Sequence, residues 1–461
     1  MNKQTASTGI WLSLTNCIIA LPALITAESY DVIRLLAILS FVLFVILLLR
    51  RLGNVLFLAR TLFLGGIGYY PMMVKVLAGP DALFSLYEPG TQGFDIAIVM
   101  YVATSLAILG NEIGLSLGSR VSAPTPAESF ARPSGLWRTI FYACIPIILL
   151  VSFLTIQAVG PTVFTATYAS QAEGQLLGNT QNIGIICLLA VFVASYKADI
   201  RYGRAVFIVL AIVFLVWAMF LRGLRQDVVT AVLGIAVCYG LVRGREYRLS
   251  LKGISVVLAF LFVVELMGAA RAVIATEAVT FTDLWQLMVS KPLEGSSAYH
   301  FGTVSPIATT FSNIVYLIDS KTMDLLFGKS FLEFIPRTPP EFLYPDRPRD
   351  YAWIFDDYGL GATGGIFELA EAYMNFGFLG VLLIPGIISF LMARAFYGAL
   401  HRQSVISYFL LFTFLGMFLR GTWYQIFAFY KSFLTALILF VVFAVLHSLF
   451  RTGFKNAREG C

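Results

Sequence analysis

Long apolar runs dominate the chain and constrain its fold more than any other feature. About twelve runs are of the length, roughly 17–25 residues, that a helix needs to cross a bilayer. They begin near Ile10, Asp31, Asn54, Phe94, Trp137, Ile183, Ala205, Asp227, Gly253, Gly365, Ser404 and Gln425. Only 13% of residues are charged, against about 25% in soluble domains. The sequence therefore predicts an all-α polytopic membrane protein with about twelve transmembrane helices.

Lysine and arginine residues between the runs indicate the orientation of the helices. With the N-terminus in the cytosol, the outer connections 80–93 and 159–182 contain neither residue type. The cytosolic side then holds Arg50, Arg51, Arg120, Arg132, Arg138, Lys197, Arg201, Arg204, Arg243, Arg245, Arg248, Lys252, Arg394, Arg402, Arg451, Lys455 and Arg458. This asymmetry predicts a multi-pass protein with both termini in the cytosol. The first run lacks a convincing cleavage site, so we expect a retained helix.

One connection, residues 272–364, is far longer than usual loops and lies on the outer side in this topology. Aromatic residues recur through it, so it can form a packed core. We expect a large ordered loop of short helices that caps the membrane domain. The chain would then divide into residues 1–271 with nine helices, the cap 272–364, and residues 365–461 with three helices.

Several arginines oppose the orientation signal because they lie at outer helix ends or in the long loop. They are Arg222, Arg225, Arg271, Arg337, Arg347, Arg349 and Arg420. Snorkelling, or pairing with acids such as Asp227 or Glu265, could explain any one of them. As a group they favour a polyanionic ligand at the membrane surface, because the planar guanidinium binds phosphate through paired hydrogen bonds. A lipid pyrophosphate fits that position.

A proline-rich stretch of the loop, Phe334–Asp350, contains three of these arginines. Its prolines prevent a regular helix and favour rigid extended backbone, which would fix the arginines relative to one another. A stiff surface linker with solvated charges is the alternative interpretation.

Two carboxylates follow at the start of the tenth predicted span. Glu368 and Glu371 are three residues apart, so both lie on one helix face, which we place close to the outer interface. Acids at a helix N-terminus are favoured by the helix dipole, which is the structural alternative. The functional hypothesis is a general base, for which His300 in the loop is a further candidate. His401 and His447 fall on the cytosolic side and are poor candidates.

The sequence lacks the motifs of nucleotide-driven pumps, serine hydrolases and metalloproteases. It contains no P-loop for nucleotide-driven pumping, no GxSxG, no HExxH and no DxD in the outer loops. The five cysteines form no CxxC or Cys/His cluster. The net charge of +6 comes from scattered short clusters, which are typical of insertion signals rather than of nucleic-acid binding. We predict neither a metal nor another cofactor.

Three motifs in their order resemble the Wzy-type O-antigen and oligosaccharide repeat-unit polymerases of bacterial inner membranes. They are Leu221-Arg-Gly-Leu-Arg225, the Ile335-Pro-Arg337 segment with Tyr344-Pro-Asp-Arg-Pro348, and Glu371-Ala-Tyr-Met-Asn-Phe-Gly377. The resemblance implies a GT-C-like membrane glycosyltransferase with an active periplasmic face. It also implies undecaprenyl-pyrophosphate-linked oligosaccharide as substrate, membrane lipid as surroundings, and a chain-length regulator and a flippase as partners.

On that resemblance, the arginines would bind the pyrophosphate and stabilise its charge as it leaves, while Glu371, Glu368 or His300 would activate the acceptor hydroxyl. An O-antigen ligase, which transfers glycan to lipid A core, is an alternative of the same class. A transporter or lipid flippase is an alternative of another class, and it predicts charges at mid-membrane and discontinuous helices. A structural scaffold would leave the arginines unexplained.

Overall fold

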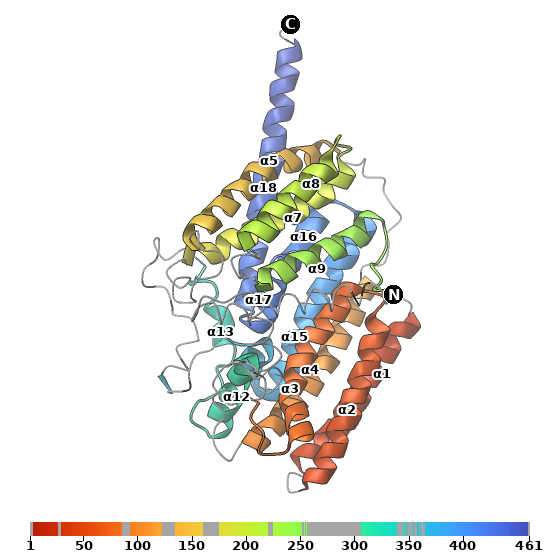
Figure 1. Ribbon diagram of the computed structural model, residues 1–461, viewed down its shortest axis with the longest axis vertical. Helices are drawn as coiled ribbons and strands as arrows, with labels where there is room; N and C mark the ends of the chain where they lie inside the picture. The colour runs from red at the N-terminus through yellow and green to blue at the C-terminus, as the bar shows by residue number, and fades with distance from the viewer. Residues whose placement is uncertain are drawn as a thin grey trace, which may run out of the picture. The chain divides into compact units, whose positions relative to one another are not determined.

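The protein is helical in every regular element that the computed structural model describes (Figure 1). The structure describes residues 3–25, 29–84, 93–121, 134–159, 175–219, 225–250, 253, 255, 306–338, 344, 346, 348, 354, 357–358, 360 and 365–459. The long helices are α1 (Lys3–Ala20), α2 (Tyr30–Arg51), α3 (Val55–Ala78), α4 (Gly93–Val121), α5 (Ser134–Val159), α7 (Gln175–Lys197), α15 (Glu368–Arg402) and α18 (Phe427–Glu459). The shorter ones are η1 (Leu21–Leu24), α8 (Gly203–Ala211), η3 (Ile212–Met219), α9 (Arg225–Val242), α12 (Pro306–Asp319), α13 (Lys329–Leu332), α16 (Val405–Leu415) and α17 (Phe418–Trp423).

Among the described residues, 8 helices are long and apolar enough to cross a membrane, as in a multi-pass membrane protein. Their exposed faces are apolar; Leu35, Ile46 and Leu49 of α2 are examples. The helices α9 and α16, and α8 with η3, lie at three further predicted positions but are shorter. The ninth predicted helix lies almost entirely outside the described residues, so the number twelve stays a prediction.

The described chain forms two compact units, each assembled from segments that are distant in sequence. The first comprises Met1–Ala123, Tyr299–Tyr397 and Arg420–Ala428, and the second comprises the remaining segments. The predicted boundaries at 271/272 and 364/365 fall outside the described residues or directly beside them, and they stay predictions.

The first unit is built around α1, α2, α3 and α4, which pack alongside one another (Figure 1). Its buried core joins Phe44, Tyr69 and Tyr101 of these helices to Phe311 of α12 and to Phe367. α12 packs against α3 and α4. This helix lies within the predicted loop, so part of that loop belongs to the same core as the long helices.

A row of glycines on α4 sets how closely α15 approaches it. Gly110, Gly114 and Gly118 are spaced by four residues, so they form one stripe. A Cβ atom on Gly110 or Gly114 would collide with the carbonyl oxygen of Leu382 or Gly386 of α15. Backbone therefore packs on backbone here, as small residues allow in membrane helices.

α15 is broken near its start. Phe376 (φ −142°, ψ 17°) and Gly377 (φ 58°, ψ −141°) leave the helical region, and only glycine readily adopts the second conformation. A straight helix of 35 residues would be about 50 Å long, well beyond the roughly 30 Å bilayer core. The break divides it into a short helix, residues 368–375, and a long helix, residues 378–402. A Cβ on Gly380 would collide with the carbonyl of Ala372, so the chain folds back sharply at the break.

A segment before α13 caps the end of the short helix. The amides of Leu326 and Phe327 donate to the carbonyls of Met374 and Asn375, both at 3.0 Å. The Asn375 side-chain oxygen accepts from the Gly328 amide, also at 3.0 Å. These bonds satisfy carbonyls that the break leaves without helical partners. The predicted loop is thereby joined to the start of α15.

The second unit packs α5, α8, α9 and α16 around α7. The buried Asn182 of α7 accepts a hydrogen bond from the Ser432 hydroxyl of α18 at 3.3 Å. Thr139 Oγ1 of α5 and His447 Nδ1 of α18 lie 3.0 Å apart. Such inter-helical bonds fix the register of helices whose apolar faces alone would specify it weakly.

Candidate functional site

The first unit contains four of the side chains that the sequence singles out: Glu368, Glu371, Arg337 and Arg420. Arg225 is the first residue of α9 in the second unit, and its side chain is not described. Five predicted residues lie outside the described part of the chain: His300, Arg222, Arg271, Arg347 and Arg349. Their assignment to the site stays a prediction.

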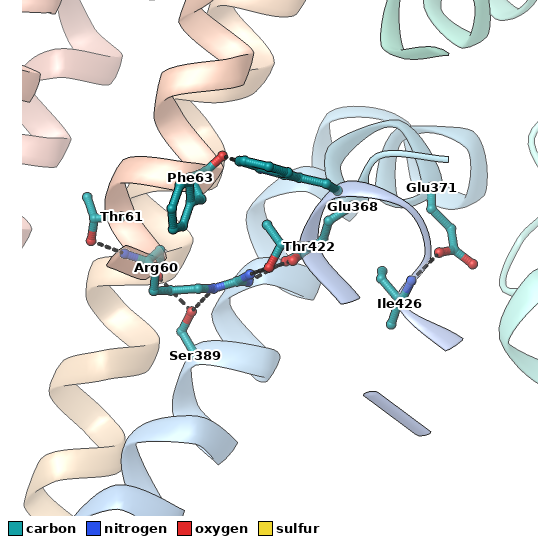
Figure 2. Close-up of polar contacts among 10 residues, drawn as sticks. Arg60, Thr61, Phe63, Glu368, Glu371, Ser389, Thr422 and Ile426 are labelled. Carbon is teal, nitrogen blue, oxygen red and sulfur yellow. Dashed lines mark hydrogen bonds and ion pairs between the residues drawn. The ribbon is translucent and has the colours of Figure 1, made fainter. Parts of the chain in front are cut away.

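Glu368 forms a buried ion pair with Arg60 of α3 (Figure 2). Asn54 caps α3 by accepting hydrogen bonds from two amides of the first turn, and this start places Arg60 in the second turn. Both carboxylate oxygens of Glu368 accept hydrogen bonds from the guanidinium. Both side chains are 0% exposed. Such a bidentate pair fixes geometry as well as charge.

Further polar groups complete the surroundings of Arg60. Its Nε donates to Ser389 Oγ of α15 at 3.2 Å, and its Nη1 donates to Thr422 Oγ1 of α17 at 3.1 Å. Ser389 in turn donates to Asn111 Oδ1 of α4 at 2.7 Å. Arg60 therefore contacts both parts of the broken α15, the short helix through Glu368 and the long helix through Ser389, and also the short α17 (Figure 2).

The break in α15 also sets the position of Glu368 along that helix. Its partner Arg60 donates a hydrogen bond to Ser389, which lies near the middle of the long helix 378–402. Glu368 is thus level with the interior of a candidate span, and its placement near the outer interface stays a prediction. This level follows from the sharp reversal at Gly377, because the short helix runs back alongside the long one.

Glu371 is 1% exposed and faces two other segments. Its Oε1 accepts a hydrogen bond from Ser330 Oγ of α13 at 3.2 Å, and its Oε2 accepts from the Ile426 amide at 3.1 Å. Figure 2 shows Glu371 turned toward Ile426, whereas Glu368 points to Arg60. The two carboxylates therefore serve different partners, although they are three residues apart.

Arg337 ends the turn after α13 and is 6% exposed. Its guanidinium lies 5.1 Å from the ring centroid of Phe427, an arrangement that attracts a cation electrostatically. Phe334, in the same turn, has its ring centroid 4.9 Å from that of Phe427. Arg337 is thereby held beside the segment that contacts Glu371, since Phe427 directly follows Ile426.

Arg420 lies on α17, whose following turn docks onto the start of α15. The Arg420 carbonyl accepts from the amides of Tyr424 at 3.1 Å and Gln425 at 2.9 Å, which closes the turn. The Tyr424 carbonyl accepts from the Ile366 amide. The Arg420 side chain is partly buried. The structure thus gathers three segments, 330–337, 366–371 and 420–427, that carry Arg337, Glu371 and Arg420.

One more carboxylate lies near these segments, and the sequence analysis did not single it out. Asp319 ends α12 and accepts a hydrogen bond from the Tyr373 hydroxyl at 3.1 Å. The residue as a whole is exposed, but neighbouring groups partly bury its carboxyl group. This burial raises the pKa of Asp319, and the hydrogen bond from Tyr373, which lowers the pKa, offsets only part of that rise.

Arg60 and Ser330 also escaped sequence reasoning. Ser330 has no distinguishing pattern. Arg60 has one: it is a charge inside an apolar run, and such charges are rare in membrane helices and usually paired or functional. In the described part of the chain, no three His, Cys, Asp or Glu side chains come together as a metal site.

Comparison of the chain with protein-family models, curated proteins and solved structures finds no match.

Proposed function

We propose that the protein is a glycosyltransferase that joins undecaprenyl-pyrophosphate-linked oligosaccharide units on the periplasmic face of a bacterial inner membrane, as a Wzy-type polymerase does. The observation that carries the proposal is the gathering of segments 330–337, 366–371 and 420–427 in one unit. They bring a buried carboxylate, Glu371, together with segments that carry Arg337 and Arg420. A base and phosphate-binding cations are the groups that this transfer needs.

In the proposed reaction, the acceptor hydroxyl oxygen attacks the reducing-end C1 of the growing glycan. A new C–O bond forms as the bond between C1 and the pyrophosphate oxygen breaks. The hydroxyl proton goes to Glu371, and the electron pair of the broken bond leaves with the lipid pyrophosphate. Energy comes from the lipid-pyrophosphate linkage, so the reaction needs no nucleotide.

Glu371 is the better base of the two adjacent acids. Both oxygens of Glu368 are already bound by one guanidinium. Glu371 instead accepts a hydroxyl hydrogen bond from Ser330 at 3.2 Å, which is the kind of bond an acceptor sugar would make before it loses its proton. In this proposal the sugar hydroxyl displaces Ser330 when it binds.

The arginines supply positive charge for the leaving pyrophosphate. Arg337 and Arg420 lie on the gathered segments, and we assign Arg222, Arg225, Arg271, Arg347 and Arg349 the same role from the sequence motifs. His300 stays a candidate for a second proton-transferring group. Twelve spans, a periplasmic cap, cytosolic termini, and a chain-length regulator and flippase as partners belong to the same proposal.

A reconstitution experiment tests this function. Purified protein in proteoliposomes receives a lipid-pyrophosphate-linked repeat unit alone, and the products are separated on a gel. A ladder of glycan lengths is the expected result. Transfer only to added lipid A core would instead identify a ligase, and no turnover with either acceptor would contradict both enzyme functions.

A lipid-linked oligosaccharide transporter or flippase is a second candidate. The observation that favours it is a charged pair, Arg60 and Glu368, level with the interior of a candidate span, beside the discontinuous helix α15. Against it, the two charges are bound to each other and fully buried rather than directed into an aqueous path. Movement of a labelled lipid-linked unit between leaflets, without any new glycosidic bond, would establish this function instead.

A further inference from the structure

We propose that Arg60 is a positioning residue for the glycan-transfer site. It fixes the short helix 368–375, which carries Glu371, relative to α17, which carries Arg420. This inference rests on the proposed function. Arg60 has no place in the transfer chemistry itself, because the groups that bind it are Glu368, Ser389 and Thr422.

Two of these partners belong to segments that build the site. Glu368 belongs to the short helix that presents Glu371 one turn later. Thr422 follows Arg420 by two residues on α17 and precedes the turn that contacts Glu371 through Ile426. One guanidinium therefore binds directly to two of the three segments that build the site, 366–371 and 420–427, and it anchors them to α3 of the helix core.

The buried ion pair of Arg60 and Glu368 is better explained by positioning than by stability. Removing two charges from water is costly, and apolar residues of similar volume often give equal or higher stability at buried sites. Stability alone therefore gives little reason for Arg60 and Glu368. Apolar residues cannot reproduce the directions of the guanidinium hydrogen bonds, which fix Glu368 and Thr422 relative to each other.

A second buried ion pair in the first unit serves as the control for replacing Arg60 and Glu368. Arg51 of α2 and Glu112 of α4 form this pair, with side chains 9% and 0% exposed. Arg51 donates to both carboxylate oxygens of Glu112, and Glu112 also accepts from Asn111. This pair therefore joins α2 to α4, whereas Arg60 joins α3 to the short helix and to α17. Replacing this pair tests what the loss of a buried ion pair does away from the site.

The experiment compares two double variants, Arg60→Met/Glu368→Met and Arg51→Met/Glu112→Met. Methionine approximates the volume of both side chains without charge. We expect both proteins to be folded and monodisperse, with thermal midpoints near that of the wild type. The first should lose about a hundredfold or more of kcat for ladder formation with a smaller change in KM, because misplacement by about 1 Å can cost that much. The second should keep kcat within about threefold, since the hydrogen bonds from Arg60 to Glu368 and Thr422 are retained.

The single variant Thr422→Val tests the same inference if Arg60→Met/Glu368→Met does not fold. Valine has nearly the same shape as threonine, so Thr422→Val removes the hydrogen bond that Arg60 donates to α17 and leaves the packing in place. It should lower kcat by about tenfold, the equivalent of one hydrogen bond to a charged group. Wild-type kcat in Thr422→Val, or in the folded Arg60→Met/Glu368→Met variant, would overturn the inference.

Hydrogen exchange separates this inference from the proposed function. The amides of Ile366 and Ile426 join the two segments, so their exchange should accelerate in Arg60→Met/Glu368→Met and Thr422→Val but not in the Arg51/Glu112 control. If the wild type forms no ladder, the proposed function fails, while the exchange data still decide whether Arg60 positions the segments. Unchanged exchange in both variants would overturn the inference whatever the activity.

Discussion

Replacing Glu371 by glutamine separates its proposed role as a base from its structural role. The carboxylate accepts hydrogen bonds from Ser330 Oγ and the Ile426 amide. A hydrogen bond to a charged group contributes about 1.5–3 kcal/mol, so Glu371→Ala would remove about 3–6 kcal/mol. That is a large share of the roughly 5–15 kcal/mol that stabilises a folded domain, so an inactive alanine variant would be uninformative.

Glu371→Gln keeps the shape of the side chain and one acceptor oxygen. The glutamine oxygen can still accept from the Ile426 amide, so we expect a loss of at most about 1.5–3 kcal/mol, which lowers the thermal midpoint without unfolding the protein. An amide cannot accept the proton of the acceptor hydroxyl. Chain growth should therefore fall by about 10²–10⁴-fold, the usual contribution of a general base.

The assay measures the initial rate of ladder formation by the purified variant, with size-exclusion chromatography as the test of folding. Glu333→Gln is the matched control: Glu333 lies next to α13, is partly exposed, and has a side-chain ion pair with Lys329 at 3.9 Å. Such surface pairs contribute about 0–1 kcal/mol, so this variant should be as active as the wild type. A folded Glu371→Gln protein that keeps more than about a tenth of the wild-type rate would refute general-base catalysis by this residue.

Three further predictions concern the break in α15, its packing and the arginines. Gly377→Ala should lower the thermal midpoint, because a φ of 58° with a ψ of −141° costs about 1–3 kcal/mol for a residue with a Cβ. The added Cβ would meet no atom within 4 Å, so the effect would come from the backbone alone. An unchanged midpoint would contradict the strain. Gly114→Leu should abolish folded, monodisperse protein in chromatography, since its side chain would collide with the backbone of Gly386; normal yield would contradict the close packing. Arg222→Ala and Arg337→Ala should each abolish ladder formation while folded protein is retained, and full activity in both would remove the pyrophosphate argument.

The helical architecture was accessible from the sequence because the bilayer imposes both length and apolar composition on a span. α2, α4 and α5 follow their apolar runs closely. The predicted start near Gly365 also lies close to that of α15. Propensity and hydropathy are local properties, and local properties are sufficient for elements of this kind.

The site was only partly accessible, since it depends on contacts between residues distant in sequence. Arg60 and Glu368 are 308 positions apart, and no local pattern joins them. The break at Phe376–Gly377 has no strong signal either, because single glycines are common in membrane helices and few mark a reversal. A continuous helix predicts that Glu368 and Glu371 share one face near the outer surface. With the break, Glu368 faces the helix core and Glu371 faces the loop segment at Ser330.

The most direct test of glycan polymerisation is the ratio of lipid pyrophosphate released to glycosidic bonds formed. Proteoliposomes containing the purified protein receive one lipid-pyrophosphate-linked repeat unit, and both products are quantified by mass spectrometry over the same time course. The proposed function predicts one undecaprenyl pyrophosphate for each new bond, with the formation of both products slowed about 10²–10⁴-fold in Glu371→Gln. Substrate that crosses the bilayer without forming bonds or releasing lipid pyrophosphate would contradict it.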